Sequence, residues 1–234
     1  MKVDTLNYRM HLDDPTAYII TVKGNQVSEQ LSKRCQQSCE QVGQPYTVWD
    51  AFDGTNGKEI YYPDHLKNQD QFKWLKQMND KLTIGEIAAI LSHFSLWCRC
   101  VTIDEPIVVL EHDAVMVKKY ECHDGWNQIQ YLGNLEQYQK QMWPSFPPHS
   151  AATKNWRFIC RAHAYAIDPA IARQLISHLI KFGLSAPADM LIRVDLFPIV
   201  QTGFYAFDLP GETTIGGRDP EWANDAKQIF ESFI

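Results

Sequence analysis

Apolar and polar positions fall into blocks along the first fifty residues, and these blocks predict a strand, a helix and a second strand. Residues 18–22 form a short apolar run that is typical of a buried strand, and residues 46–49 form another. Between them, apolar residues recur at helical spacing, at Val27, Leu31, Cys35, Cys39 and Val42. Gly43 is expected to end this helix. A strand–helix–strand unit of this kind begins a parallel sheet.

A second helix is predicted to begin after Thr83, because Thr83 and Glu86 have the spacing of a capping box. Its apolar positions share one face, formed by Ile87, Ile90, Leu91, Phe94, Cys98 and Val101. Glu86, His93 and Trp97 form a second stripe beside that face. Position on the helix does not decide whether His93 and Trp97 belong to a site or to the rim of a buried helix.

Further along the chain, residues 161–167 are expected to form a strand and the residues after them a helix. Asp168 is a good N-cap for that helix, Pro169 suits its first position, and Gly183 ends it. Asp53 and Gly54 are a turn signal. The alternation of strands and helices predicts an α/β fold with a mostly parallel central sheet flanked by helices.

Three segments have weaker patterns. Residues 1–16 are predicted to contribute an edge strand, and residues 219–234 a C-terminal helix. Residues 120–157 are irregular and rich in aromatic residues and proline. They form either an acceptor-side loop whose rings stack on sugars or a plain surface excursion. No repeat or linker interrupts the chain, so residues 1–234 are expected to form one domain.

The composition narrows the function classes. The chain has 234 residues, of which 45% are hydrophobic and 21% charged, as in ordinary globular proteins. A net charge of −6 argues against a nucleic-acid partner. We see no signal peptide and no apolar run of the ~20 residues that a transmembrane segment needs. A cytoplasmic protein with reduced cysteines is therefore expected.

An acidic motif follows the most apolar strand of the sequence. Residues 107–110 predict a buried strand, and Glu111 and Asp113 come directly after it. Side chains i and i+2 of a strand point the same way, so the two acids would converge and His112 would point to the opposite side. Buried carboxylates are costly without a partner, and a divalent cation is a usual partner. The alternative is that these acids merely end a strand in solvent.

The motifs around these residues resemble glycosyltransferase family 25, which contains lipopolysaccharide-type and collagen-type galactosyltransferases. The first matching run is LTIGEIAAILSHFSLW, and the second is PIVVLEHDAVM. The matching residues are Gly85, Glu86, Leu91, Ser92, His93, Trp97, Glu111 and Asp113. Later stretches that also agree are WNQIQYLG, HAYAIDPAIARQLI and PADMLI. The resemblance covers most of residues 17–217.

The sequence also departs from the family pattern. His112 stands where the family usually has the central Asp of its acidic triplet, and Ala88 and Ala89 stand where it usually has Gly and Cys. Both flanking acids of the triplet are kept. Metal binding is therefore still expected, although His112 leaves open a loss of catalytic activity.

The resemblance implies a single GT-A-type, Rossmann-like domain and a metal-dependent glycosyltransferase of lipopolysaccharide biosynthesis. A hexose such as galactose would move from a nucleotide sugar, typically a uridine diphosphate (UDP) sugar, to a glycan or another hydroxyl acceptor. Glu111 and Asp113 would hold manganese or magnesium, which neutralises the diphosphate leaving group. An inverting reaction needs a general base, for which Asp189 is the best candidate. Asp189 could equally serve as a helix N-cap.

Five further residues are candidates for the donor site. His93 and His163 would contact the diphosphate or orient an acid, and hydrogen-bonded core positions are the alternative for both. Glu86 belongs to the matched motif, although it would also complete the capping box. Asp50 and Asp53 follow the second strand, where a nucleoside would lie; turn formation explains Asp53 equally well.

Two other functions stay open from the sequence. One is another metal-dependent nucleotide enzyme, such as a nucleotidyltransferase, but we find no Gly-rich phosphate loop with a basic residue. The other is a sugar- or nucleotide-binding protein that descends from a transferase and has lost its activity.

Overall fold

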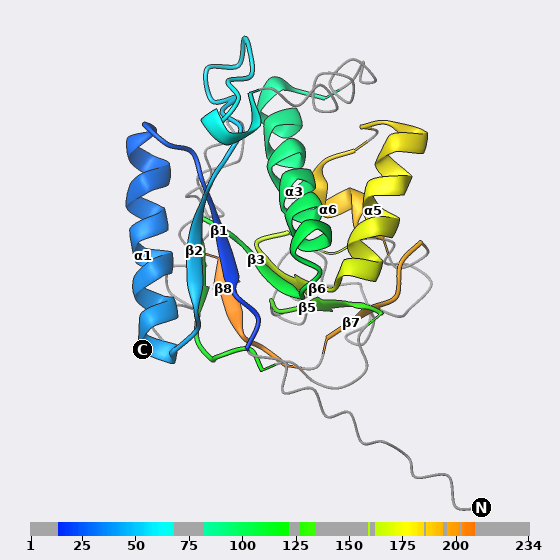
Figure 1. Cartoon of the computed structure of the whole chain (residues 1–234). Coiled ribbons are helices and arrows are strands. Elements are labelled where there is room, and N and C mark those ends of the chain that lie inside the picture. The colour runs from blue at the N-terminus through cyan, green and yellow to red at the C-terminus, as the bar shows by residue number, and fades with distance from the viewer. Residues whose placement is uncertain are drawn as a thin grey trace, which may run out of the picture.

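The structure of the chain is a computed structural model. It describes residues 14–67, 82–121, 127–133, 159, 162–184, 186–193, 196–201 and 203–208. The C-terminal helix predicted over 219–234 lies outside these residues, as do most of the edge strand predicted within 1–16 and most of the irregular segment 120–157. The described part of the chain folds around one central sheet, with helices on both of its faces (Figure 1).

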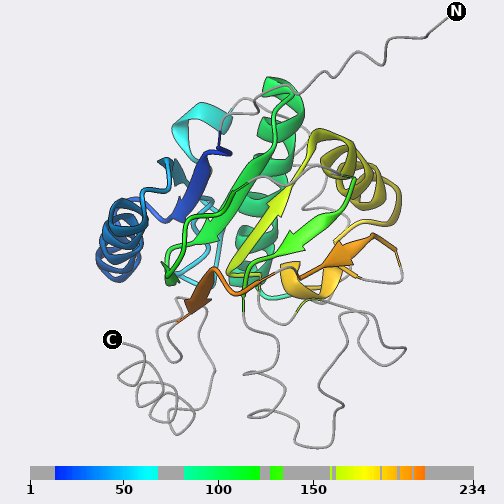
Figure 2. The same cartoon turned by 90° about the horizontal axis from the view of Figure 1, so that it is seen from below.

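The central sheet has six strands in the order β2-β1-β3-β6-β5-β7. These strands are β1 (Ala17–Thr21), β2 (Tyr46–Asp50), β3 (Ile107–Glu111), β5 (Ile129–Tyr131), β6 (Ala164–Ile167) and β7 (Ile199–Val200). β1 pairs in parallel with β2 and β3, and β5 pairs in parallel with β7. β6 lies antiparallel between β3 and β5 (Figure 2). The prediction of an α/β fold with a mostly parallel sheet is confirmed.

Helices cover the two faces unequally. The longer ones are α1 (Gln26–Val42), α3 (Ile84–Ile103) and α5 (Pro169–Phe182), and the shorter ones are η1 (Asp64–Leu66) and α6 (Ala188–Leu191). α1 packs on one face, together with a two-stranded sheet of β4 (Ala114–Met116) and β8 (Ala206–Asp208). α3 and α5 pack side by side on the other face (Figure 1).

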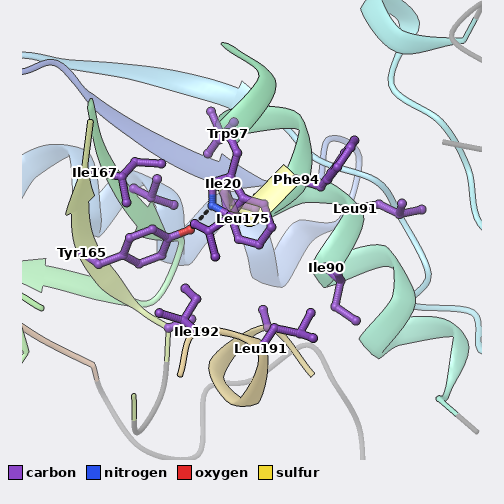
Figure 3. Packing of buried hydrophobic residues seen from close by; sticks show 14 of the residues in the cluster. Ile20, Ile90, Leu91, Phe94, Trp97, Tyr165, Ile167, Leu175, Leu191 and Ile192 are labelled. Carbon is purple, nitrogen blue, oxygen red and sulfur yellow. Dashed lines mark hydrogen bonds between the residues drawn. The ribbon is translucent and has the colours of Figure 1, made fainter. Parts of the chain in front are cut away.

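Strand alternation divides the buried side chains into two cores. The core under α3 and α5 includes Tyr18, Ile20, Ile107, Val109, Tyr165 and Ile167. The core under α1 includes Ala17, Ile19, Val108, Leu110, Ala164 and Ala166. Figure 3 shows part of the first core, in which Leu175 of α5 and Leu191 of α6 belong to the same cluster as Tyr165 and Trp97. Each strand thus contributes alternate residues to opposite faces.

α1 forms where it was predicted, with one correction to its buried face. Asn25 caps its first turn, and Gly43 follows its last residue with a left-handed φ of 72°, which glycine adopts at no steric cost. Val27 was predicted to be buried, but its side chain is 53% exposed. The buried face begins one residue later at Ser28, whose hydroxyl accepts a hydrogen bond from the backbone N–H of Val22. That bond joins the helix to the end of β1.

α3 confirms the predicted capping box between Thr83 and Glu86. It is buried on more sides than one stripe predicts, because it is enclosed by the sheet and by α5. The side chains of His93 and Trp97 are buried in the protein rather than at the rim of the helix. Its 20 residues, with a mean hydropathy of 1.3, would suffice to cross a membrane, a length that the sequence was expected not to offer. However, 61% of that stretch is buried in the protein, as in the central helix of a globular core.

β6 covers Ala164–Ile167 of the strand predicted over 161–167, and the predictions for the helix after it agree with the structure. Asp168 caps α5 by accepting a hydrogen bond from the N–H of Ile171, Pro169 is the first residue of the helix, and Gly183 follows its last. Cys35, Cys39, Cys98 and Cys100 are free thiols.

Gly54 holds the segment after β2 against the start of α3. A Cβ atom at this position would lie 2.6 Å from the carbonyl oxygen of Ile84 and 2.9 Å from the Cβ of Ala88. Glycine is therefore required here for close approach, and the turn predicted from the sequence is only part of its role. The backbone N–H of Phe52 strengthens this contact by donating to the hydroxyl of Ser92 at 3.0 Å.

We predict that Gly54→Ala destabilises the protein by about 1–3 kcal/mol, because the added methyl group must push the loop away from the helix backbone. Urea unfolding followed by circular dichroism measures this change. Lys58→Ala, at an exposed position of the same loop, is the control and should alter stability by less than about 0.5 kcal/mol. Equal stabilities of the two variants would show that the loop does not depend on this contact.

Candidate functional site

A cavity lies at the carboxyl ends of β1, β2 and β3, between the sheet and the first half of α3. Its lining includes Phe52, Gly54, Thr55, Gly85, Ser92, His93, Glu111, His112 and Asp113. This is the edge at which open α/β sheets bind ligands. The cavity volume is about 80 Å³, which suits an ion or the end of a ligand rather than a whole nucleotide sugar.

Glu111 faces the α3 side of this cavity and contacts His93. The Nε2 atom of His93 lies 3.1 Å from Oε1 of Glu111, and its Nδ1 atom lies 2.9 Å from the hydroxyl of Tyr165. The indole N–H of Trp97 donates to the same hydroxyl at 2.9 Å. The Glu111 side chain stays 33% exposed, whereas that of His93 is 1% exposed. Glu111 thus joins a buried polar network to the open cavity.

The surroundings of Glu111 hold its carboxylate in the charged form. Burial alone would raise the pKa of Glu111. The hydrogen bond with His93 and the charges of His93, His112 and His163 outweigh this effect and lower its pKa to about 2. An ionised carboxylate is the form that a hard cation requires.

His112 faces the other side of the cavity, as strand alternation predicted. Its Nδ1 atom lies 3.2 Å from the hydroxyl of Ser28, the same hydroxyl that accepts from the N–H of Val22. Glu111 is thus held by α3, and His112 is held by α1. In the tautomer with the proton on Nε2, the hydroxyl of Ser28 donates to Nδ1.

Asp113 lies beyond the last residue of β3, in the turn that leads to β4. It lines the cavity, and its backbone carbonyl accepts from the guanidinium of Arg34 at 3.5 Å. Among the described residues there is no group of three or more His, Cys, Asp or Glu side chains that would hold a metal ion by themselves. Magnesium and similar cations often use one or two carboxylates and complete their shell with phosphate oxygens and water. Glu111 and Asp113 fit a cation of that kind.

Asp50 and Asp53 are not part of the cavity lining, although their neighbours are. Asp50 faces the α1 side of the sheet, where it lines a separate depression with Thr21 and Lys23, and burial raises its pKa. The carboxylate of Asp53 accepts hydrogen bonds from the backbone N–H and the hydroxyl of Thr55, which is the turn role considered from the sequence. Thr55 itself lines the cavity.

The other three candidates, Glu86, His163 and Asp189, also lie outside the cavity lining. The Glu86 carboxylate accepts from the N–H and the hydroxyl of Thr83. His163 is fully buried, 3.5 Å from the carbonyl of Ala206 and edge-on to the ring of Tyr131.

Asp189 is the second residue of α6 and is half-buried. Pro187 occupies the N-cap position of this helix, so the alternative in which Asp189 is the N-cap is wrong. The physical reason is that α6 begins at Ala188, two residues earlier than that alternative requires.

Sequence reasoning missed three polar residues that shape the site. Tyr165 bonds His93, Ser28 bonds His112, and Ser92 joins the loop after β2 to α3. Ser92 and Tyr165 lie inside motifs that had been matched to the family, so a signal was present for both. Nothing in the sequence indicated a role for Ser28 beyond its position in the first turn of α1.

Comparison with known proteins finds one family whose profile matches most of the chain. The profile of glycosyltransferase family 25 (LPS biosynthesis protein) matches residues 15–192. No curated protein matches the chain. A solved structure that is similar is that of a glycosyltransferase involved in the glycosylation of the major capsid of PBCV-1. It is 6% identical, with a TM-score of 0.44, over 92% of this chain and 99% of that one. A likeness this distant carries no residue assignment.

The lowered pKa of Glu111 predicts a stability difference that depends on pH. Because the folded-state pKa of about 2 lies below the ordinary value of 4.5, the ionised carboxylate stabilises the folded state above pH 4.5. This stabilisation is lost as the pH falls from 4.5 towards 2. The free energy of unfolding of the parent should therefore fall more steeply over this range than that of Glu111→Gln.

Urea unfolding at several pH values measures both slopes. Glu105→Gln, an exposed acid in the loop between α3 and β3, is the control and should follow the parent. Parallel curves for the parent and Glu111→Gln would contradict the strong hydrogen bonding of Glu111.

Proposed function

We propose that this chain, which belongs to glycosyltransferase family 25, transfers a hexose such as galactose from a UDP-sugar to a hydroxyl group of a glycan. Family membership supports a glycosyltransferase, and the donor and acceptor are our proposal. The observation that supports the proposal is the cavity at the carboxyl ends of three parallel strands. It gathers His93, Glu111 and Asp113, all of which match family motifs.

Glu111 and Asp113 are the residues that would hold a divalent cation, manganese or magnesium. When bound, such a cation neutralises the negative charge that develops on a diphosphate leaving group. Glu111 is kept ionised for this purpose by His93, and Asp113 adds a second carboxylate from the following turn. With these two acids as its ligands among the described residues, the cation should bind well only together with the diphosphate of the donor.

His112 gives this chain a hydrogen-bond donor where the family usually has an acid. Ser28, whose hydroxyl accepts from the N–H of Val22, holds the imidazole in the cavity wall. We assign its Nε2–H to an oxygen of the donor diphosphate, because a charged acceptor strengthens such a hydrogen bond. The same contact would be repulsive for a carboxylate unless a cation lay between them.

Asp189 is the proposed base for an inverting transfer. In this step the acceptor oxygen forms a bond to the anomeric carbon, and the bond from that carbon to the diphosphate breaks. UDP leaves with the electron pair, and the hydroxyl proton passes to Asp189. α3 and α5 run in opposite directions, so the end of α5 returns the chain towards the cavity end of α3 shortly before Asp189 (Figure 1).

A protein that binds nucleotide sugars without transferring them is the second candidate, and His112 in the acidic motif favours it. The two functions differ in turnover. A transferase releases free UDP from a UDP-sugar in proportion to glycosylated acceptor, whereas a binding protein retains the donor intact.

We predict that Asp113→Asn and Glu111→Gln weaken the manganese-dependent affinity for UDP by at least about tenfold, since loss even of groups that only support metal ligands costs this much. Transfer should be nearly abolished, and the effect should be larger for Asp113. Both variants should fold, because an amide keeps the size of the carboxylate and still accepts a hydrogen bond. Calorimetry with and without manganese measures the affinities.

Two further variants complete this experiment. Asp104→Asn is the matched control, because Asp104 is exposed at the end of α3, in a left-handed conformation that Asn tolerates. His112→Asp restores the usual triplet of the family and should preserve or improve metal binding. If the Asn and Gln variants bind UDP like the parent, these acids only end a strand and the proposed metal site is wrong.

We predict that Asp189→Asn lowers turnover by roughly 10²- to 10⁴-fold while affinity for UDP changes little, because the amide cannot accept the acceptor proton. Steady-state transfer rates and calorimetry measure the two effects. Near-normal turnover would assign Asp189 to the structure of α6 instead.

A further inference from the structure

The buried hydrogen-bond chain that connects Trp97, Tyr165, His93 and Glu111 has only one consistent direction when the His93 ring is neutral. We infer that this chain fixes the tautomer of His93 and the orientation of Glu111, so that Tyr165 is a positioning residue of the donor site. The part of this inference that concerns ligand binding depends on the proposed function. The part that concerns the tautomer does not.

The fold sets the geometry of this hydrogen-bond chain. Trp97 and His93 lie one turn apart on α3, and Tyr165 faces them from β6. β6 pairs with β3 so that Tyr165 lies opposite Val109, two residues before Glu111. Tyr165 and Glu111 therefore reach His93 from neighbouring strands on the same face of the sheet. Figure 3 shows Tyr165 and Trp97 joined in the core by the first of the three hydrogen bonds.

The donors and acceptors follow from the chemistry of the two ends. An indole N–H only donates, so the Tyr165 oxygen accepts from Trp97 at 2.9 Å. An ionised carboxylate only accepts, so His93 donates its Nε2–H to Glu111 at 3.1 Å. The Nδ1 atom of the neutral ring is then an acceptor, and the Tyr165 hydroxyl donates to it at 2.9 Å.

The opposite tautomer is disfavoured because it leaves two conflicts. A proton on Nδ1 would make His93 a second donor to the Tyr165 oxygen and remove Nδ1 as the acceptor of the Tyr165 hydroxyl proton. It would also place the lone pair of Nε2 against the negative charge of Glu111. Water does not readily supply the missing hydrogen bonds, because Trp97, Tyr165 and His93 are each no more than 1% exposed.

The hydrogen bond from His93 fixes the orientation of the Glu111 carboxylate. Its Oε1 atom is engaged by His93, so it offers its other oxygen to the cavity. Trp97 and Tyr165 do not line the cavity and reach it only through His93. The Tyr165 hydroxyl thus acts on the donor site by keeping Nδ1 an acceptor and Nε2 a donor.

The tautomer is tested directly by long-range ¹H–¹⁵N NMR of the histidine rings, without any ligand. The parent should show His93 with its proton on Nε2, and Tyr165→Phe should shift the ¹⁵N signal of Nδ1, because that atom loses its hydrogen-bond donor. The His93→Gln spectrum identifies the His93 signals. A parent ring with its proton on Nδ1 would overturn the inference.

A double-mutant cycle tests the positioning role. Tyr165→Phe should weaken manganese-dependent UDP affinity by roughly 10- to 100-fold, the usual effect of removing a group that orients a ligand. In a His93→Gln background, the amide donates to Glu111 without help from Tyr165, so the same change should cost less than about twofold. Equal losses in both backgrounds would show that Tyr165 only packs the core.

Tyr120→Phe is the matched control, because Tyr120 is equally buried but lies in the core under α1. It should change neither the His93 spectrum nor UDP affinity. If the parent binds no UDP, the proposed function fails, and the His93 spectrum alone still decides the direction of the chain. If the parent binds UDP and Tyr165→Phe binds it equally well, the positioning role fails and the proposed function stands.

Discussion

The site depends on the parallel pairing of β1 with both β2 and β3. Because these strands run the same way, their carboxyl ends meet at one edge, and the segments that follow them surround one cavity. The pairing also explains why the acidic motif serves a cavity and does not simply end in solvent. α3 begins at the same edge and packs so closely there that the segment after β2 needs glycine at position 54.

Local hydrogen bonding could be predicted from the sequence, and this accounts for most of the correct predictions. The capping box of Thr83 and Glu86 and the Asp168 cap each involve atoms within three residues of one another, so their spacing is sufficient to predict them. The run 107–110 predicted β3 because a buried parallel strand is apolar on both faces.

Features that depend on distant partners could not be predicted in this way. Asp50 was predicted to follow the second strand, but it is the last residue of β2, and its side chain lies on the face that α1 covers. Val27 fits an apolar stripe, but the helix turns Ser28 inward to bond the end of β1. Tyr165 was quoted within a motif without a role, since nothing in the sequence shows that β6 lies beside β3.

The buried hydrogen-bond chain from Trp97 to Glu111 restricts which substitutions the protein can accept during evolution. Tyr165 lies 68 residues from Trp97 and 72 from His93, yet each of its hydrogen bonds needs a particular donor or acceptor at the far end. A substitution at one of these positions leaves a polar atom stranded in the core until a second substitution removes or replaces its partner. The helix motif and the β6 motif should therefore be inherited as a pair, with joint replacement the easier path of divergence.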